Sequence, residues 1–207
     1  MGIPVLLFGG TEVQVLSLVT VLKRAGYEVS ICCYYEFDQT VVDQFKEAGV
    51  EIFLLKLDRS NGYFCIKNIW ELMRKLINVF EMYSPNIIHV QYLAPGLIPI
   101  IAARLSRIPT IFATVHIAGS IVYGLKVRLL LRIAAKLTTV FICVSQGVEK
   151  FWFGESRLFQ PKKPDDHRKH FTIYNGIDVS KITEITGGVD RDELRNSFGI
   201  KDQLVVG

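Results

Sequence analysis

The chain has 207 residues, of which 50% are hydrophobic and 21% are charged. This composition excludes an intrinsically disordered protein, and the 16 Gly and 7 Pro follow no period that would indicate a collagen-like sequence. The net charge of +4 excludes a strongly basic nucleic-acid-binding protein, although it is compatible with anionic ligands or membranes. The length allows one large domain, or one domain and part of another.

Short apolar runs rich in β-branched and aromatic residues predict the strands of a parallel sheet that is buried on both faces. We expect a short first strand within Ile3–Phe8, because Pro4 limits its pairing. The last residues, Gln203–Gly207, have the pattern of a strand that is just beginning. The other predicted strands are Val29–Tyr35, Val50–Leu57, Asn86–Gln91, Thr110–Val115, Thr139–Val144 and His170–Ile173.

Segments with helical periodicity separate these strands. Asp38 is the expected N-cap of the second helix, and the polar segment Gly154–Lys169 is expected to be a surface loop. This alternation of strands and helices predicts an α/β fold with a doubly wound parallel sheet of the Rossmann-like type. The predicted helices are Thr11–Ala25, Gln39–Ala48, Ile66–Met82, Gly96–Leu105, Tyr123–Ala135, Gln146–Phe153 and Arg191–Phe198.

The four cysteines show neither a disulfide framework nor the spacing of a zinc site. Cys32 and Cys33 are adjacent in an apolar run, and Cys65 and Cys143 are isolated, so we expect buried, reduced thiols. Residues 1–8 lack the basic start of a signal peptide. Basic residues interrupt the apolar stretches before they reach the roughly 18 residues of a membrane span. These features predict a cytoplasmic protein.

Two candidate site elements follow the first and fifth predicted strands, where ligands bind in open parallel sheets. Gly9, Gly10 and Thr11 begin the first helix, where backbone amides suit a phosphate, although a plain tight turn is the alternative. His116 falls at the tip of its strand, where an imidazole can donate to a substrate hydroxyl or a developing charge. The alternative is a loop histidine without a function.

Three further residues lie at strand ends. His89 and Tyr92 close the strand Asn86–Gln91, and His89 is either a cleft residue or a core histidine bonded to the backbone. Ser145 is either a ligand hydroxyl or the N-cap of the next helix. A nucleophilic serine is not expected, because the pattern Gly-x-Ser-x-Gly is absent. His167 and His170 in the polar loop do not indicate a metal site.

The segment 124–136 predicts a basic, amphipathic helix, and Phe151, Trp152 and Phe153 form an apolar cluster. Both could contact an anionic membrane. The alternative, which we favour, is a helix that packs on the core with solvated basic residues and an aromatic cluster that is covered.

Six motifs occur in collinear order over essentially the whole chain. They are Gly9–Gln14, Pro85–Gln91, Ile108–His116, Cys143–Ser145, Tyr174–Asp178 and Arg191–Ile200. This order resembles that of the family 4 glycosyltransferases, which have the GT-B architecture. Asn175-Gly176-Ile177-Asp178 is the most specific motif, and in that family it marks the crossing between two Rossmann-like domains.

The resemblance implies the N-terminal, acceptor-side half of a GT-B fold at residues 1–173. An interdomain linker at 174–190 and the start of a truncated C-terminal donor domain at 191–207 would follow. Carried over by position, Gly9, Gly10 and Thr11 face the donor phosphates, and His116 is the catalytic residue that contacts the transferred sugar. His89, Tyr92 and Ser145 line the cleft, and Asn175, Gly176 and Asp178 shape the hinge.

The implied activity is a retaining transfer of a hexose from a nucleotide-sugar donor to a glycan or lipid-linked acceptor, in polysaccharide or glycoconjugate biosynthesis. The resemblance implies no cofactor, metal or nucleic-acid partner, and it places the protein in the cytoplasm, with a peripheral contact at the inner face of the membrane. Because the donor half lies downstream in the family, we expect the chain alone to be inactive or nearly so. The alternatives are a non-hydrolysing sugar-nucleotide epimerase and a non-catalytic binding module.

Overall fold

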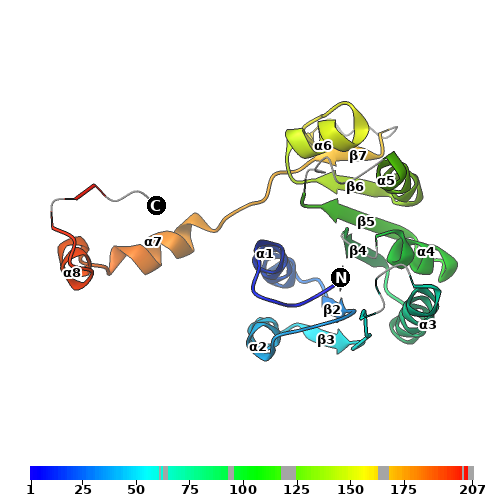
Figure 1. The fold of residues 1–207 in the computed structure, drawn as a ribbon, viewed down its shortest axis with the longest axis horizontal. Helices are drawn as coiled ribbons and strands as arrows, with labels where there is room; N and C mark the ends of the chain where they lie inside the picture. Colours follow the sequence, from blue (N-terminus) through cyan, green and yellow to red (C-terminus); the bar gives the residue numbers. More distant parts are fainter. Residues whose placement is uncertain are drawn as a thin grey trace. The chain divides into compact units, whose positions relative to one another are not determined.

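The structure is a computed structural model that describes residues 1–60, 62, 65–92, 96–117, 125–162, 168–201 and 203–204. The chain divides into two compact units, Met1–Asn175 and Gly176–Gly207. In the described part of the first unit, parallel strands form one sheet in the order β3-β2-β1-β4-β5-β6-β7 (Figure 1). The strands are β1 (Gly2–Ile3), β2 (Ser30–Cys33), β3 (Glu51–Leu54), β4 (Ile87–Gln91), β5 (Thr110–Val115), β6 (Val140–Cys143) and β7 (His170–Thr172).

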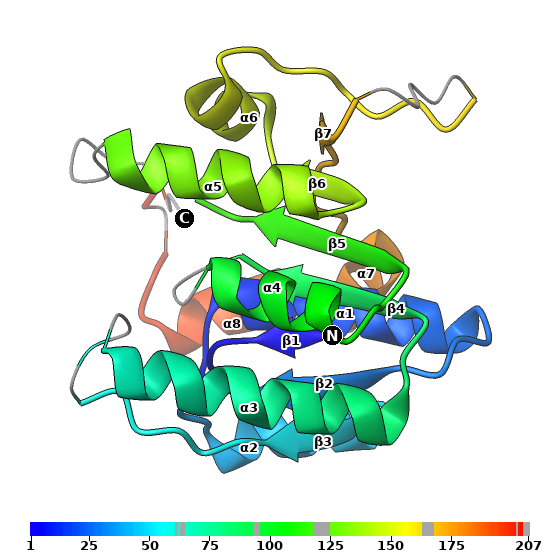
Figure 2. The ribbon, with the colours of Figure 1, turned by 90° about the vertical axis from the view of Figure 1, so that its right-hand side faces the viewer.

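Helices cover both faces of this sheet, which confirms the predicted doubly wound α/β fold (Figure 2). The first face carries α1 (Gly10–Arg24) and α2 (Gln39–Glu47), and their apolar stripes bury residues such as Val19 and Phe45 against β1–β3. The other face carries α3 (Ile66–Tyr83), α4 (Leu97–Leu105), α5 (Leu125–Leu137) and α6 (Gln146–Phe153). A second apolar core, which includes Leu76, Ile100 and Leu131, lies beneath them.

The first strand is shorter and begins earlier than predicted. It covers only Gly2–Ile3, because Pro4 has no N–H to donate to a neighbouring strand. The chain nevertheless continues beside the end of β2, where the amide of Tyr35 donates to the carbonyl of Pro4 at 2.9 Å. Leu6 then forms an isolated parallel bridge with Phe37. The six later strands are present where they were predicted, most of them with shorter ends.

The predicted helices of the first unit are also present. Asp38 caps α2 as expected, since its carboxylate accepts hydrogen bonds from the amides of Thr40 at 2.8 Å and Val41 at 3.4 Å. The predicted helix Tyr123–Ala135 is observed from Leu125 to Leu137, and its first two predicted residues lie outside the described part of the chain.

The second unit contains α7 (Val179–Gly187) and α8 (Arg191–Ser197). Helix α8 was predicted, whereas α7 lies in the segment 174–190, which was expected to be a linker. Its β-branched residues have weak helix propensity, so the local pattern did not predict it. The hydroxyls of Thr183 and Thr186 donate to carbonyls one turn earlier, at 2.9 Å each. Of the expected final strand, residues 203–204 have no regular structure and 205–207 lie outside the described residues.

The cysteines agree with the expectation of buried thiols. Cys32, Cys33 and Cys143 are buried and Cys65 is partly buried, all four as free thiols. Burial raises the pKa of both Cys32 and Cys33 to about 12. Among the described helices, none has both the length and the apolar character that a membrane span needs.

Candidate functional site

The strand order reverses between β1 and β4, and ligands of doubly wound sheets bind beside the carboxyl ends of the strands at such a point. Strands β4 and β5 pair so that Gln91 lies opposite Thr114. Side chains alternate along each strand, and Val90 and Val115 belong to the core beneath α3–α5. Gln91 and Thr114 therefore lie on the opposite face of the sheet.

His116 and Gln91 form a hydrogen-bonded pair on this opposite face, with 2.7 Å between His116 Nε2 and Gln91 Oε1. The amide oxygen only accepts hydrogen bonds, so Nε2 of His116 carries the proton and Nδ1 keeps its lone pair. Gln91 is only 2% exposed, which holds the acceptor in a fixed place. Burial lowers the pKa of His116 below its usual value, so this imidazole is neutral near pH 7.

His89 and Thr114 form a second pair one step back along the same two strands. The distance between His89 Nε2 and Thr114 Oγ1 is 2.7 Å, and the His89 ring meets Phe112 edge-on. Burial lowers the pKa of His89 to about 3, with smaller contributions from the amino terminus and His116. His89 is thus a neutral, partly buried group whose bond is to a side chain rather than to the backbone.

Tyr92 follows Gln91 and turns to the other face of the sheet. Its amide donates to the carbonyl of Thr114 at 2.7 Å, and its ring packs edge-on against Phe141 with 5.3 Å between the centroids. Burial raises the pKa of its phenol far above the usual value. The structure therefore places the Tyr92 ring with the apolar core and not beside His116.

Ser145 lies at the carboxyl end of β6 and begins α6. Its hydroxyl oxygen accepts a hydrogen bond from the amide of Val148 at 3.2 Å, which confirms the N-cap interpretation. The hydroxyl proton can still be donated to a ligand, so the predicted cleft role of Ser145 stays a prediction.

The glycine pair stands at the start of α1, with Gly9 as N-cap in an extended conformation. A Cβ atom on Gly9 would lie 2.5 Å from Oε2 of Glu12, whereas one on Gly10 would meet no atom within 4 Å. Within the described chain no side chain caps this helix start, so its first amides, including that of Thr11, are suited to an anion. Glu12, only 9% exposed, places a carboxylate beside Gly9.

The sequence reading did not identify Gln91 and Thr114 as partners of the two histidines. Their signal was present, since His89-x-Gln91 and Thr114-x-His116 put polar residues on one face of otherwise apolar strands. The sequence also did not predict the hydrogen bond that holds the segment after β5 to α6. The indole Nε1 of Trp152 in α6 donates to the carbonyl of Ile117 at 3.0 Å, next to His116.

The remaining predicted residues lie elsewhere. Asn175, Gly176 and Asp178 are exposed at the boundary between the two units, and their hinge role stays a prediction. His170 bonds Glu149 at 2.6 Å, and His167 lies outside the described residues. In the described part of the chain, no three His, Cys, Asp or Glu side chains are grouped as a metal site.

The reversed strand order, the glycine-started helix and the histidines at the carboxyl ends of β4 and β5 define a Rossmann-like domain of the GT-B type. The particular family follows from a sequence comparison. The model of Glycosyltransferase Family 4 matches residues 8–193, so the chain belongs to that family. No curated protein matches the sequence.

Solved structures support the same fold. A glycosyltransferase from Rickettsia africae has a TM-score of 0.71 at 14% identity, over 98% of this chain and 49% of its own. HepE from Anabaena, in complex with UDP, has a TM-score of 0.62 at 14% identity, over 95% and 50%. UDP-N-acetylglucosamine 2-epimerase from Rickettsia bellii has a TM-score of 0.56 at 12% identity, over 97% and 52%. The chain thus spans about half the length of these structures.

Proposed function

We propose that this chain is the acceptor-side half of a retaining glycosyltransferase that moves a hexose from a nucleotide-sugar to a glycan or lipid-linked acceptor. One observation carries the proposal. A neutral imidazole, His116, is held by a buried amide at the carboxyl end of β5, on the strand edge where this fold binds ligands. Family membership supports the reaction class.

In this proposal the residues of the chain have distinct roles. His116 contacts a hydroxyl of the transferred sugar, and Gln91 sets which nitrogen the sugar meets. The first amides of α1, with Gly9, Gly10 and Thr11, face the donor diphosphate and stabilise its charge as it leaves. Ser145 and His89 stand at the neighbouring strand ends. No metal or cofactor is assigned a role in this proposal.

We expect this half of the fold to bind a substrate but not to transfer a sugar by itself. The chain covers about half of each similar structure, and transfer needs both the donor and the acceptor side of the cleft. HepE was solved with UDP, which supports a uridine nucleotide-sugar as the first donor to test. The proposed location is the cytoplasm, peripherally at the inner face of the membrane.

The test measures release of nucleoside diphosphate and glycosylated product from a nucleotide-sugar, for the chain alone and for a protein in which a family 4 donor domain follows it. We expect transfer only in the second protein, and a loss of at least about 100-fold with His116→Ala, as for a contact made in the transition state. Gln44→Ala, at an exposed position of α2, is the control and should leave the rate unchanged. Normal transfer by His116→Ala would reject the catalytic role of His116, and no transfer by the two-domain protein would favour a non-catalytic binding module.

A sugar-nucleotide epimerase is the second candidate, because epimerases from Rickettsia bellii and Neisseria meningitidis share the fold at TM-scores of 0.56 and 0.54. An epimerase converts the nucleotide-sugar without an acceptor. Product analysis in the absence of acceptor therefore separates the two reactions, and formation of an epimer would replace the transferase proposal.

A further inference from the structure

The positive charge of the chain is concentrated in one segment. Residues 82–148 contain no Asp or Glu but six Lys and Arg, whereas the other residues contain 18 Lys and Arg and 20 Asp and Glu. This segment, which includes α4 and α5, therefore carries a charge of +6, whereas the rest of the chain carries −2. Its basic residues are Arg104, Arg107, Lys126, Arg128, Arg132 and Lys136.

Helix α5 has an apolar stripe on each of two sides. Its inner side buries Leu131, Ala134 and Ala135 in the core. Its outer side leaves large apolar side chains in solvent, and their exposed fractions are 84% for Leu125, 60% for Leu129, 41% for Leu130 and 38% for Ile133. Large apolar side chains at helical spacing on an outer face are unusual for a helix that contacts only water.

Cations surround this outer apolar stripe. Lys126 and Lys136 are exposed on α5 itself. Arg128 and Arg132 donate from Nε to the carbonyl of Trp152 at 3.1 and 3.3 Å, which holds both guanidinium groups at the junction of α5 and α6. In the described part of the chain, none of these four cations pairs with a carboxylate. The surface is apolar at its centre and positive at its rim.

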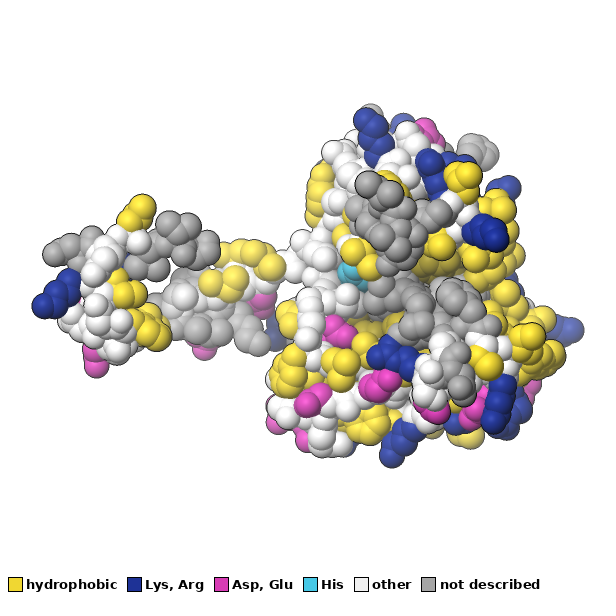
Figure 3. All heavy atoms as spheres, in the orientation of Figure 1, with side chains coloured by type: hydrophobic (Ala, Val, Ile, Leu, Met, Phe, Trp, Pro, Cys, Tyr) yellow, Lys and Arg dark blue, Asp and Glu magenta, His cyan; other side chains and the backbone are white. Residues whose placement is uncertain are grey.

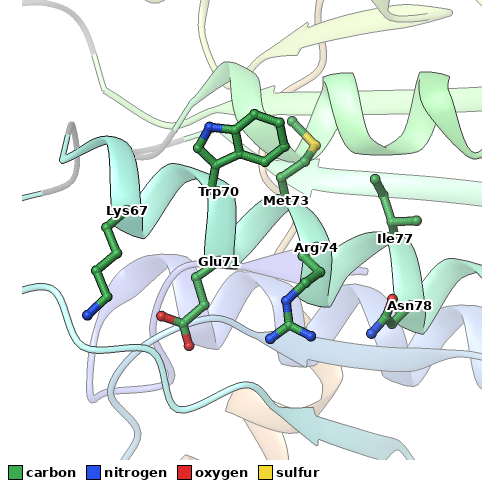
Figure 4. Close-up of a pocket in the computed structure, with 7 residues that line it drawn as sticks. All are labelled: Lys67, Trp70, Glu71, Met73, Arg74, Ile77 and Asn78. Atoms are coloured by element: carbon green, nitrogen blue, oxygen red, sulfur yellow. The ribbon is translucent and has the colours of Figure 1, made fainter.

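The same helical layer continues to α3 (Figure 2). Trp70 is 69% exposed there and lines a shallow groove of about 510 Å³ together with Lys67, Met73, Arg74 and Ile77 (Figure 4). Glu71 also lines this groove, and its carboxylate pairs with Lys75 at 3.3 Å. In the space-filling view, hydrophobic side chains mixed with Lys and Arg lie along the side formed by α3–α5 (Figure 3). An exposed indole beside basic groups is typical of the membrane–water interface.

We propose that the outer surface of α3–α5, centred on α5, binds an anionic phospholipid bilayer. Leucines enter the headgroup boundary and lysines meet the anionic lipids, as in helices that lie in the membrane plane. Protein interfaces are depleted in Lys but enriched in Trp, Met and Arg, so it is the unbalanced positive charge of residues 82–148 that favours an anionic bilayer over a protein partner. The segment 124–136 combines features of both interpretations, because α5 packs on the core and keeps a second apolar face exposed. The aromatic cluster is only partly covered, since Trp152 is 4% exposed and Phe151 is 38% exposed.

This inference rests on the peripheral membrane location in the proposed function, and its test is sedimentation of the chain with lipid vesicles. Phosphatidylcholine vesicles are compared with vesicles that also contain phosphatidylglycerol. We expect binding to the anionic vesicles that weakens with added salt. Lys126→Gln with Lys136→Gln should weaken partitioning about 30-fold, because each lysine near the surface contributes about fivefold, equal to about 1 kcal/mol. Leu129→Gln with Ile133→Gln should weaken it as well.

The matched control is Lys23→Gln with Arg24→Gln at the end of α1, on the opposite face of the sheet, which should bind as the wild type does. Circular dichroism checks that every variant is folded. The proposal is overturned if the wild type does not bind anionic vesicles. It is also overturned if the two α5 double variants bind these vesicles as well as the wild type does. It is also overturned if the α5 variants abolish only self-association. No donor or acceptor is present, so this result is independent of transfer.

Discussion

Gln91 Oε1 accepts a hydrogen bond from Nε2–H of His116 at 2.7 Å, and the two residues are 25 positions apart in the chain. The pair exists because β4 and β5 lie side by side in parallel register, with Gln91 opposite Thr114. A buried amide oxygen selects one neutral tautomer of the imidazole. The nitrogen that remains for a ligand is therefore Nδ1, which defines His116 as a hydrogen-bond acceptor at that atom.

The first prediction concerns this tautomer. With Gln91→Leu the acceptor is lost and His116 should populate both tautomers, whereas with Gln91→Glu the new carboxylate should raise the pKa of His116. Long-range proton–nitrogen NMR spectra across a pH titration report both effects. His170 is hydrogen-bonded to Glu149 and serves as an internal control, whose signals at any given pH should be the same in both variants as in the wild type. Unchanged His116 signals in both variants would contradict the assignment.

The second prediction concerns the buried carboxylate of Glu149, which is 0% exposed. It accepts hydrogen bonds from His170 Nδ1 at 2.6 Å, from the Thr172 hydroxyl at 2.6 Å and from the amide of Arg157 at 2.9 Å. Burial raises the pKa of Glu149, but these bonds together outweigh burial, so its pKa lies below the usual value. The carboxylate thus joins α6 to β7 and the loop between them.

Glu149→Ala should lower the free energy of unfolding by about 3 kcal/mol, because several buried donors lose their acceptor. Urea unfolding followed by circular dichroism measures the change. Glu155→Ala, at a carboxylate whose side chain is 65% exposed, is the matched control and should cost less than about 1 kcal/mol. Equal losses in the free energy of unfolding for the two substitutions would contradict the stabilising role of the buried Glu149 carboxylate.

The third prediction concerns pH. The pKa of His89 is about 3 in the folded chain and 6.5 in an unfolded one, so the unfolded state binds more protons between these values. The free energy of unfolding is therefore unaffected by protonation of His89 above pH 6.5. It falls as the pH drops from 6.5 toward 3, by up to about 1.4 kcal/mol per pH unit. His89→Gln should remove this contribution to the slope between pH 6.5 and 4.5, measured by urea unfolding. A variant with the wild-type slope would contradict it.

The fourth prediction compares two leucines of α5. Leu131→Ala empties a site that is 1% exposed in the core and should destabilise the chain by about 2–5 kcal/mol. Leu129→Ala removes a side chain that is 60% exposed and should change stability by less than about 0.5 kcal/mol. Thermal or urea unfolding of the two variants decides the point, and a large loss with Leu129→Ala would mean that this face is covered.

Local pattern alone determined most of the fold. Strand β5 and helix α6 have the predicted ends, Thr110–Val115 and Gln146–Phe153, and Asp38 and Ser145 cap the helices that follow them. These features depend on neighbours within a few residues, so a linear sequence contains them. Helix α7 was missed for the same reason, because its β-branched residues favour other conformations locally.

Only the tertiary structure decided which polar residues meet. The sequence put His89, Tyr92 and His116 at strand ends. Strand register and side-chain alternation place the partly buried Tyr92 ring against the core and pair His116 with Gln91. The membrane-facing role proposed for α5 also needed the structure, since a helical pattern does not reveal which of two apolar stripes another helix or strand covers. Pairing and burial join residues distant in the chain, and they arise only when the sheet and its helices pack together.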